Sequence, residues 1–348
     1  MKKAIIYYGG FIGKAGGVTS HMRAIGNEMR IQGWSVLTIS LESLPAWCRY
    51  LPHLVEKLLN TVNPPMGFLY KGTLTKILYK IFFSKNADVC IFEDIYIAWD
   101  SDRPSITVLH AVWSDNLQSY SVSAKQESKL KKYEAEAIDG INQPIVTVSY
   151  PYLEYIKREH FSGTLSKEIG VVELGVDQSS FQESIEGSRK SIVYCGALEA
   201  RKNVLFLLQV FKTLSEIDSA YKLTIIGDGP DRQELAGFVK TNGLSVNFLG
   251  KLNHENVVSE LRRHGIYLHT SVKESFSYSL LEAKLIGLKT CAYDKLQVPA
   301  EFIDMAISTF NVDEWCNGIL NIDWTPKIFN AENYTIEKMT SSTLSLAR

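Results

Sequence analysis

The stretch "SVKESFSYSLLEAKLIGLKT", residues 271–290, carries two glutamates with seven residues between them, Glu274 and Glu282. The apolar run "GIYLHTS" that leads into it is typical of a buried strand, and a helix is expected to begin near Ser277. Glu274 then lies before the helix, and Glu282 lies one to two turns inside it. Backbone N–H groups at the start of a helix carry about half a positive charge, which favours an anion.

These groups match, in order, a ligand with hydroxyls at both ends and phosphates in the middle. Carboxylates accept hydrogen bonds from hydroxyl groups, whereas backbone N–H groups, here those of Phe276 to Tyr278, suit phosphate. A nucleotide sugar has this layout, because its diphosphate joins a sugar to a ribose. The alternative is that Glu274 is a capping acid and Glu282 a solvated helix residue.

Strand-like runs alternate with helical patterns along the whole chain, which is typical of an α/β protein with parallel sheets. The first runs are "KAIIYY", "WSVLTIS", "DVCIFE", "SITVLHA" and "PIVTVS". The pattern lapses at residues 177–191, a predicted linker, and resumes with "SIVYCGA", "YKLTIIGDG", "SVNFLG", "GIYLHTS" and "LKTCAYD". We therefore expect two Rossmann-like domains with parallel sheets facing a deep cleft, residues 1–180 and 181–331. A terminal helix in 332–348 is expected to pack back on the first domain.

The composition is that of a globular protein of 348 residues, with 45% hydrophobic and 22% charged residues and a net charge of −1. So small a net charge argues against attraction to nucleic acid. The five cysteines lack metal-ligand spacing, which favours reduced thiols and a cytosolic protein. No run of about 18 apolar residues is present, so no membrane-spanning helix is expected.

Three further loops are expected at the carboxyl ends of strands, where parallel sheets bind ligands. Gly16 and Gly17 lie in a glycine-rich turn that suits an anion, although its spacing fits neither a dinucleotide-binding nor a Walker motif. A turn without a ligand is an equally good interpretation. Arg201 and Lys202, between a strand and a helix, have the charge to neutralise a diphosphate. His110 ends a strand and is either functional or structural.

Seven segments resemble, in order and spacing, those of a known enzyme family. They are "AGGVTSHM", "VLHAVWSD", "VVELGVD", "YCGALEARKN", "LTIIGDGPDRQEL", "VNFLGKL" and "ESFSYSLLEA". The chain thereby resembles the retaining GT-B glycosyltransferases of family 4, the glycosyl transferases group 1. The resemblance implies an acceptor-side first domain and a second domain that binds the nucleotide-sugar donor, UDP- or GDP-linked.

The resemblance also implies roles for individual residues. Glu274 would hold hydroxyls of the donor sugar, Glu282 the ribose, and Lys202 the diphosphate. His110 would lie near the donor sugar, and the backbone at Lys251 and Leu252 would meet the base. The implied catalytic residues are Glu274, His110 and Lys202, and the implied donor-binding residues are Gly16, Gly17, Arg201, Lys202, Lys251, Leu252, Glu274, Ser275, Phe276, Ser277, Tyr278 and Glu282.

The chain departs from the family pattern at two places. Ala197 stands where the family usually has an arginine, and Arg201 is a candidate replacement. Ser275 and Ser277 stand where the family favours glycine, so the donor pocket is expected to be narrower. These departures leave two alternatives open: a non-catalytic nucleotide-binding or scaffold subunit, and a sugar-nucleotide epimerase of similar fold.

No metal or other cofactor is expected, because the resemblance implies that lysine and the helix N-terminus neutralise the leaving diphosphate. Asp100 to Asp102 form a D-x-D sequence that holds a divalent metal in another glycosyltransferase fold, which is a competing interpretation. The expected reaction is hexosyl transfer (EC 2.4 class) with retention of the anomeric configuration, by front-face attack assisted by the departing phosphate.

Residues 45–86 combine cations with aromatic side chains and carry a single acid, Glu56. The cations are Arg49, Lys57, Lys71, Lys76, Lys80 and Lys85, and the aromatic residues are Trp47, Tyr50, Phe68, Tyr70, Tyr79, Phe82 and Phe83. Such helices suit an anionic membrane surface, although the aromatics could equally be core and the lysines a solvated face. We expect a cytoplasmic enzyme, peripheral on the inner face of the plasma membrane, with a lipid-linked glycan acceptor of a bacterial surface polysaccharide (O-antigen, capsule or lipopolysaccharide).

Overall fold

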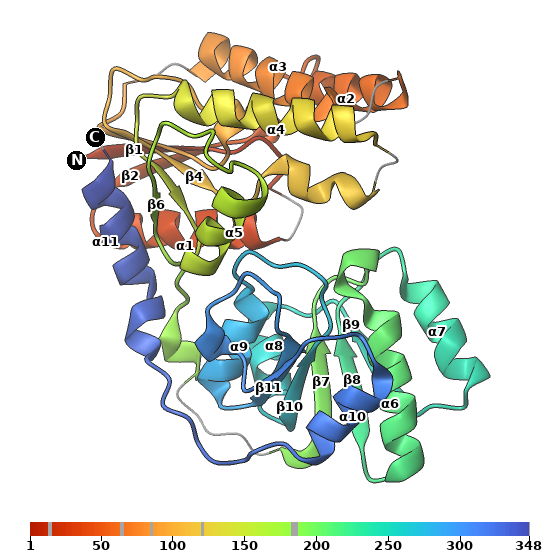
Figure 1. The fold of residues 1–348 in the computed structure, drawn as a ribbon. Helices are drawn as coiled ribbons and strands as arrows, with labels where there is room; N and C mark the ends of the chain where they lie inside the picture. Colours follow the sequence, from red (N-terminus) through yellow and green to blue (C-terminus); the bar gives the residue numbers. More distant parts are fainter. Residues whose placement is uncertain (13–15, 63–65, 84–85, 120–121, 182–186, 348) are drawn as a thin grey trace. The chain divides into compact units, whose positions relative to one another are not determined.

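The computed structural model describes residues 1–12, 16–62, 66–83, 86–119, 122–181 and 187–347. The chain divides into two compact units (Figure 1). Unit 1 comprises Met1–Gly175 and Asn333–Arg348, and unit 2 comprises Val176–Glu332. The first division therefore falls five residues before the expected boundary of 180/181.

Unit 1 contains a six-stranded parallel sheet in the order β2-β1-β3-β4-β5-β6. Its strands are β1 (Lys3–Tyr7), β2 (Ser35–Ile39), β3 (Val89–Phe92), β4 (Ser105–Leu109), β5 (Ile145–Thr147) and β6 (Ile169–Val171). Every residue of β3 and β4 is buried, as expected where helices cover both faces of a parallel sheet.

The helices of unit 1 are α1 (Gly17–Ile31), α2 (Leu51–Val62), α3 (Met66–Phe83), α4 (Ala124–Asp139), α5 (Tyr150–Glu159) and α11 (Ile336–Leu346). Helix α1 buries Met22, Ile25 and Met29, which lie on one face at helical spacing. Gly33, just beyond its end, has a φ of 84°, which glycine adopts without strain. Helix α11 lies beside α1 in unit 1 (Figure 1).

Unit 2 contains a second six-stranded parallel sheet, in the order β12-β11-β10-β7-β8-β9. Its strands are β7 (Ser188–Cys195), β8 (Lys222–Ile226), β9 (Val246–Gly250), β10 (His264–His269), β11 (Lys289–Tyr293) and β12 (Met305–Ile307). Its helices are α6 (Val204–Ile217), α7 (Arg232–Thr241), α8 (His254–Leu261), α9 (Tyr278–Ile286) and α10 (Val312–Leu320). The predicted linker was too long at its end, because β7 begins at Ser188 with three exposed polar residues.

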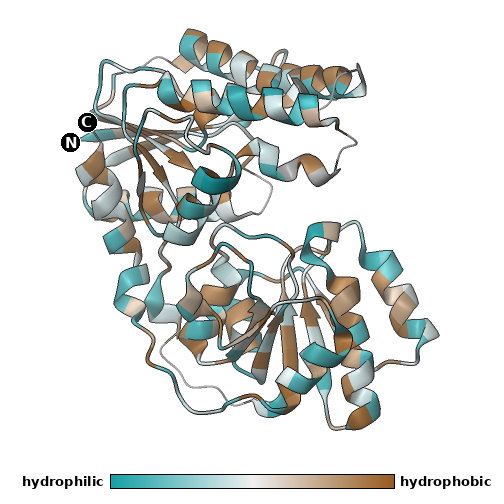
Figure 2. Cartoon of the chain, in the orientation of Figure 1, coloured by the Kyte–Doolittle hydropathy of each residue, from teal (hydrophilic) through white to brown (hydrophobic). Residues whose placement is uncertain are grey.

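The strand order reverses once in each sheet. In unit 1 the reversal lies between β1 and β3, and in unit 2 it lies between β7 and β10. The strands of both sheets are mostly hydrophobic (Figure 2), and Cys90, Cys195 and Cys291 lie on β3, β7 and β11 as free thiols. Open parallel sheets bind ligands beyond the carboxyl ends of the strands at such a reversal. Each unit therefore offers one favoured position for a site.

None of the described helices is both long and apolar enough to cross a membrane.

Candidate functional site

The carboxyl ends of β7 and β10 carry the two loops that hold the predicted donor-binding residues of unit 2. Arg201 and Lys202 lie in a short 3₁₀ helix, Ala200–Lys202, after β7. The Thr270 hydroxyl donates a hydrogen bond of 3.0 Å to the Lys202 carbonyl, and the Val272 N–H donates one of 3.1 Å to the Arg201 carbonyl. These bonds fix the loop after β7 against the loop after β10.

Glu274 lies at the centre of a cluster of cations. Its Oε1 accepts a hydrogen bond of 2.5 Å from the Lys202 ammonium, and its Oε2 lies 3.3 Å from Nη1 of Arg201. The His269 Nε2 lies 3.4 Å from the same carboxylate, and the Glu274 side chain is only 11% exposed. Burial opposes its ionisation, but Lys202, His269 and Arg201 outweigh burial and hold the pKa of Glu274 well below its usual range. Glu274 is therefore ionised at neutral pH.

Glu282 has a partner that sequence reasoning missed. Its Oε1 lies 3.1 Å from Nε2 of His254, the first residue of α8, and this hydrogen bond raises the pKa of His254. Lys251 and Leu252, predicted to meet the base, follow β9 and stand just before that helix. In the sequence, the only sign of a contact between His254 and the donor-binding residues is that His254 follows shortly after Lys251 and Leu252. The structure thus brings Glu282 close to the segment that begins at Lys251.

Helix α9 begins where the sequence predicted, and its first turn shows why glycine suits this position. Ser277 is the N-cap of α9 and has a φ of 72°, in the left-handed region that favours glycine. Its hydroxyl accepts a hydrogen bond of 3.4 Å from the Leu280 N–H. Phe276 is buried and packs edge-on against Phe302, with 5.2 Å between the ring centroids. Phe276 thereby anchors the loop that carries Ser275 and Glu274.

In unit 1, Gly16 and Gly17 lie at the start of α1. Gly16 is the N-cap of this helix, in extended conformation, and a Cβ atom built there would have no neighbour among the described residues within 4 Å. Residues 13–15 of the same glycine-rich turn lie outside the described residues.

His110, at the end of β4, belongs to a buried cluster with His21 and Glu93. Oε2 of Glu93 lies 2.7 Å from Nε2 of His110 and 2.9 Å from Nδ1 of His21. The Glu93 side chain has no exposed surface and that of His110 is 11% exposed. Burial raises the pKa of Glu93, but the two histidines outweigh burial and lower it to about 2, whereas burial lowers the pKa of His110. Glu93 is thus ionised, and it fixes the orientation of the His110 ring.

The donor atoms of this cluster all lie within 4.8 Å of one another. Two imidazoles and a carboxylate form a set that zinc accepts. However, separations of 2.7 and 2.9 Å are ordinary hydrogen-bond lengths, so hydrogen bonding to Glu93 explains the arrangement of His21 and His110 by itself. In the D-x-D sequence, Asp100 accepts hydrogen bonds from the backbone and side chain of Asn142, at 2.7 and 3.0 Å.

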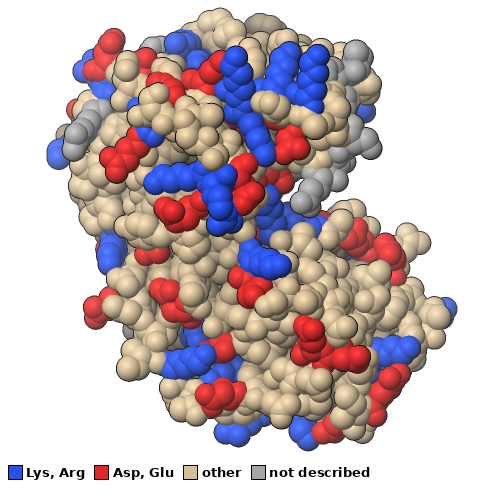
Figure 3. Space-filling view, in the orientation of Figure 1, with Lys and Arg blue, Asp and Glu red and all other residues tan. Residues whose placement is uncertain are grey.

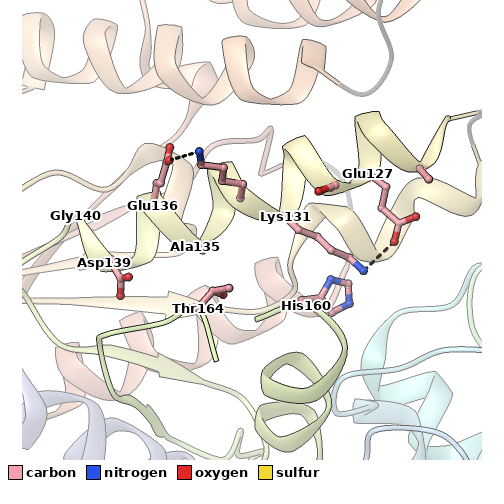
Figure 4. Close-up of a pocket in the computed structure, with 11 residues that line it drawn as sticks. Glu127, Lys131, Ala135, Glu136, Asp139, Gly140, His160 and Thr164 are labelled. Atoms are coloured by element: carbon pink, nitrogen blue, oxygen red, sulfur yellow. Dashed lines mark ion pairs between the residues drawn. The ribbon is translucent and has the colours of Figure 1, made fainter. Parts of the chain in front are cut away.

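A cavity of about 300 Å³ opens beside His110 at the strand reversal of unit 1. Its polar lining includes Glu93 and Asp94, which directly follow β3. Asp94 accepts a hydrogen bond of 3.1 Å from the Tyr96 N–H, and burial raises the pKa of Asp94 to about 7. A larger cavity, of about 920 Å³, lies along α4 and contains none of the predicted site residues (Figure 4). Its lysines form ion pairs on their own helix, as with Lys131 and Glu127 at 2.8 Å.

Residues 45–86 form α2, α3 and the segments beside them, and their predicted surface residues divide into two groups. Trp47, Tyr50 and Tyr70 are exposed, whereas Tyr79 is fully buried. Lys71 forms an ion pair of 2.8 Å with Glu56. Lys85 lies outside the described residues. The aromatic residues of this segment are therefore partly core and partly surface.

Residues 176–315 match the family described as glycosyl transferases group 1. A curated relative from Campylobacter jejuni is 33% identical over 108 residues, which are 31% of this chain and 29% of that protein. Its name describes an N-acetylgalactosaminyltransferase acting on a GalNAc-bearing glycan on PP-undecaprenol. The chain thus spans less than a third of the length of this relative.

Two solved structures resemble the whole chain. Sucrose-phosphate synthase from Thermosynechococcus elongatus has a TM-score of 0.70 at 14% identity. The matched region covers 100% of this chain and 95% of the synthase chain. The Anabaena protein HepE, solved with UDP and glucose, has a TM-score of 0.65 at 13% identity and covers 99% of both chains. At such identities the likeness shows the fold alone. The chain therefore has the two-domain GT-B fold, and its residues 176–315 match the model of the glycosyl transferases group 1 family.

Proposed function

We propose that the protein is a glycosyltransferase that moves a hexosyl group from a UDP- or GDP-sugar to a hydroxyl of a glycan acceptor, with retention of configuration. The observation that carries the proposal is the cluster of Lys202, Arg201 and Glu274 at the strand reversal of unit 2, inside the family match. Cations, a helix N-terminus and a carboxylate together suit a sugar diphosphate, because each group of that ligand finds a partner.

The chemistry proposed for this site depends on its two cations, Lys202 and Arg201. Lys202 and Arg201 both point at Glu274, and a bound diphosphate would compete with Glu274 for them. The carboxylate would then accept hydrogen bonds from the sugar hydroxyls. As the sugar–phosphate bond breaks, negative charge develops on the diphosphate, and fixed cations stabilise it. The departing phosphate is proposed to take the acceptor proton, and no metal ion is required.

Donor turnover separates this proposal from its two rivals. The pure protein is incubated with a panel of UDP- and GDP-sugars, and released nucleotide and altered sugars are measured. Slow release of nucleotide from one donor supports the transferase. A non-catalytic subunit would release none from any donor, and an epimerase would convert a donor sugar without an acceptor. Glu274→Ala should abolish the release.

We further propose a lipid-linked acceptor and peripheral binding to an anionic inner membrane surface. Eight of the seventeen exposed large hydrophobic side chains of the described residues lie between residues 47 and 81. Leu51, Leu54 and Leu58 follow helical spacing on α2, and Ile77 and Ile81 do so on α3. A solvent-exposed apolar stripe of this kind marks a surface that binds a membrane or a partner.

The charges around this stripe favour an anionic membrane. Lys57 and Lys80 are exposed, and the one acid of the segment, Glu56, is paired with Lys71. Figure 3 shows the Lys, Arg, Asp and Glu side chains on one face of the molecule. The Campylobacter relative has an undecaprenol-linked acceptor in its name, which supports the same substrate class for synthesis of a bacterial surface polysaccharide.

Sedimentation with vesicles tests this surface. The wild type should sediment with vesicles that contain anionic lipid, and the double variant Leu54→Glu, Ile81→Glu should stay in solution, because it places two charges on the apolar stripe. Ile217→Glu is the matched control, since Ile217 on α6 of unit 2 is 57% exposed, much like Leu54 at 52%. Equal sedimentation of all three proteins, or none at low salt, would leave a soluble acceptor as the better proposal.

A further inference from the structure

The cavity at the strand reversal of unit 1 has the position of a ligand site. Its lining includes Tyr8 to Gly10, which follow β1, Glu93 and Asp94, which follow β3, and His110, which follows β4. These three strands are neighbours in the sheet, so the ends of all three open on one cavity. At about 300 Å³ the cavity lies at the lower end of the range for small-molecule sites.

One polar atom at this cavity lacks a partner. Oε1 of Glu93 is buried and accepts no hydrogen bond from any residue that the structure describes, while Oε2 of the same carboxylate bonds both histidines. A buried carboxylate oxygen without a donor is costly, and such atoms in proteins usually have a partner. Glu93 also lines the cavity, so a donor group is expected to come from there.

The charges of the lining disfavour an anion. Among the described residues of the lining, Lys71 is the only lysine or arginine, and its ammonium is 2.8 Å from the Glu56 carboxylate. Glu93 is ionised, and Asp94 adds a second carboxyl group. A phosphate or carboxylate entering the cavity would thus meet two carboxyl groups, and the one lysine among the described lining residues already has a carboxylate partner. Hydroxyl groups, in contrast, can donate to these oxygens.

Part of the remaining lining is aromatic, namely Tyr8, Phe68 and Trp113. The Trp113 ring stacks on Tyr96 at 3.8 Å between centroids and meets Phe68 edge-on at 5.1 Å, so its orientation is fixed. Its side chain also bonds Asp94, which ties the indole to a carboxyl group. A rigid aromatic face beside carboxyl oxygens suits a sugar ring, because the ring carries C–H groups on its faces and hydroxyls at its rim.

We infer that this cavity binds a neutral sugar ring of the acceptor, with Asp94 and Glu93 accepting hydrogen bonds from its hydroxyls and Trp113 against its face. The inference rests on the proposed function and deepens it. The enzyme then extends a glycan that already carries a neutral sugar, and it does not place the first sugar on a lipid phosphate. An earlier glycosyl transfer must supply its substrate.

Binding of defined sugars tests the inference without knowledge of the natural acceptor. The probes are methyl glycosides of neutral hexoses and N-acetylhexosamines, together with the matching hexose phosphates and uronic acids. Binding to the full-length protein is measured by saturation-transfer NMR. The probe concentration is raised to about 20 mM, so that weak binding, with dissociation constants in the millimolar range, is detected. At least one neutral glycoside should bind, and the anionic sugars should not.

Variants locate the binding. Asp94→Ala should weaken it about tenfold or more, since a hydrogen bond to a buried carboxyl group is lost. Ala111→Leu, which places a larger side chain on the lining and removes no carboxyl group, should do the same and serves if Asp94→Ala fails to fold. Glu274→Ala, in unit 2, should leave glycoside binding unchanged. If no neutral glycoside binds, if anionic sugars bind better, or if Ala111→Leu leaves the binding unchanged, the inference is wrong.

A parallel donor measurement keeps this result separate from the proposed function. Stabilisation of the protein by UDP- or GDP-sugars reports the site in unit 2, and Asp94→Ala should leave it unchanged. A wild type that binds a donor but no neutral glycoside contradicts the inference alone. A wild type that binds neutral glycosides but no donor supports the sugar site and contradicts the proposed donor.

Discussion

The two units place carboxylates at equivalent points of two parallel sheets but surround them with opposite chemistry. In unit 2, Glu274 follows the strand at the reversal and is held by Lys202 and Arg201. In unit 1, Glu93 follows the strand at the reversal and is held by His21 and His110. Both carboxylates are nearly or fully buried, and the pKa of each lies below its usual value.

On the two proposals above, one architecture distributes two ligand chemistries. Lysine and arginine side chains, which stay charged at physiological pH, suit a diphosphate. Histidines and a second carboxyl group suit neutral hydroxyl groups. The topology fixes where a ligand binds, and a few side chains at the strand ends determine its charge. Changes to those side chains therefore test the comparison directly.

The largest effect is expected from Glu274→Ala. The variant loses the group proposed to hold the donor sugar, so donor turnover should fall by about 10²-fold or more, a usual cost for removing one positioned polar group. Steady-state nucleotide release measures it. Glu199→Ala is the matched control, since Glu199 also pairs with Arg201, at 3.0 Å, but is 40% exposed. Similar losses in both variants would mean that the ion pairing of Arg201, and not Glu274, is what matters.

The next largest effect concerns stability and acid in unit 1. The pKa of Glu93 is lowered to about 2 from 4.5, so the native state binds fewer protons than the unfolded state between these values. Its contribution is complete above pH 4.5 and is lost as the pH falls towards 2, with an upper value of about 3 kcal/mol. Glu93→Gln should thus lower the free energy of urea unfolding at pH 7, and its difference from the wild type should shrink in acid. A difference that is constant from pH 7 to pH 3 would contradict this account.

A smaller effect is expected from Arg201→Met. If Arg201 stands in for the family arginine missing at Ala197, the dissociation constant for UDP or GDP should rise about tenfold, since one charge-assisted contact is lost. Isothermal titration measures it. Arg263→Met is the control, because Arg263 is an exposed arginine of unit 2 that forms a local ion pair, 3.1 Å from Glu260 on the same segment. Unchanged affinity in Arg201→Met would remove Arg201 from the donor site.

The smallest effect has an unusual sign. Ser277 has a φ of 72°, so Ser277→Gly relieves backbone strain and should raise the free energy of unfolding by up to about 0.5 kcal/mol, after allowance for the added chain entropy. Ser275 has no such backbone conformation, so Ser275→Gly should instead lower the free energy of unfolding by about 0.5–1 kcal/mol. Chemical denaturation of both variants decides the matter, and the same sign for the two would show that strain at Ser277 is not significant.

Much of the fold followed from local patterns. Buried parallel strands are continuous apolar runs, and ten of them were predicted from the sequence. The three-residue strands β6 and β12 were missed because they are only partly buried, whereas β5, of the same length, is wholly buried. The proximity of Lys202 and Glu274 was expected, because both lie at carboxyl ends of strands and match one family motif each.

The unit 1 cluster was only partly accessible. His110 was predicted, but His21 and Glu93 were not recognised as its partners. Glu93 is 72 residues from His21 along the chain, and only the pairing of β1 with β3, and of β3 with β4, brings the three together. The contact of His254 with Glu282 was not predicted for the same reason. The two residues are 28 positions apart, and their contact depends on how α8 and α9 pack.

The path of the chain through unit 1 has a consequence for its synthesis. The chain leaves this unit at Gly175 and re-enters it at Asn333, and a Cβ on Gly175 would lie only 2.1 Å from the Thr335 carbonyl oxygen. On the ribosome, unit 2 is a continuous segment that can fold as soon as it emerges, whereas unit 1 must wait for α11. Most of unit 1 is synthesised first, but unit 1 is the last unit to complete its fold. We expect the unfinished unit 1 to be sensitive to chaperones until α11 has been synthesised.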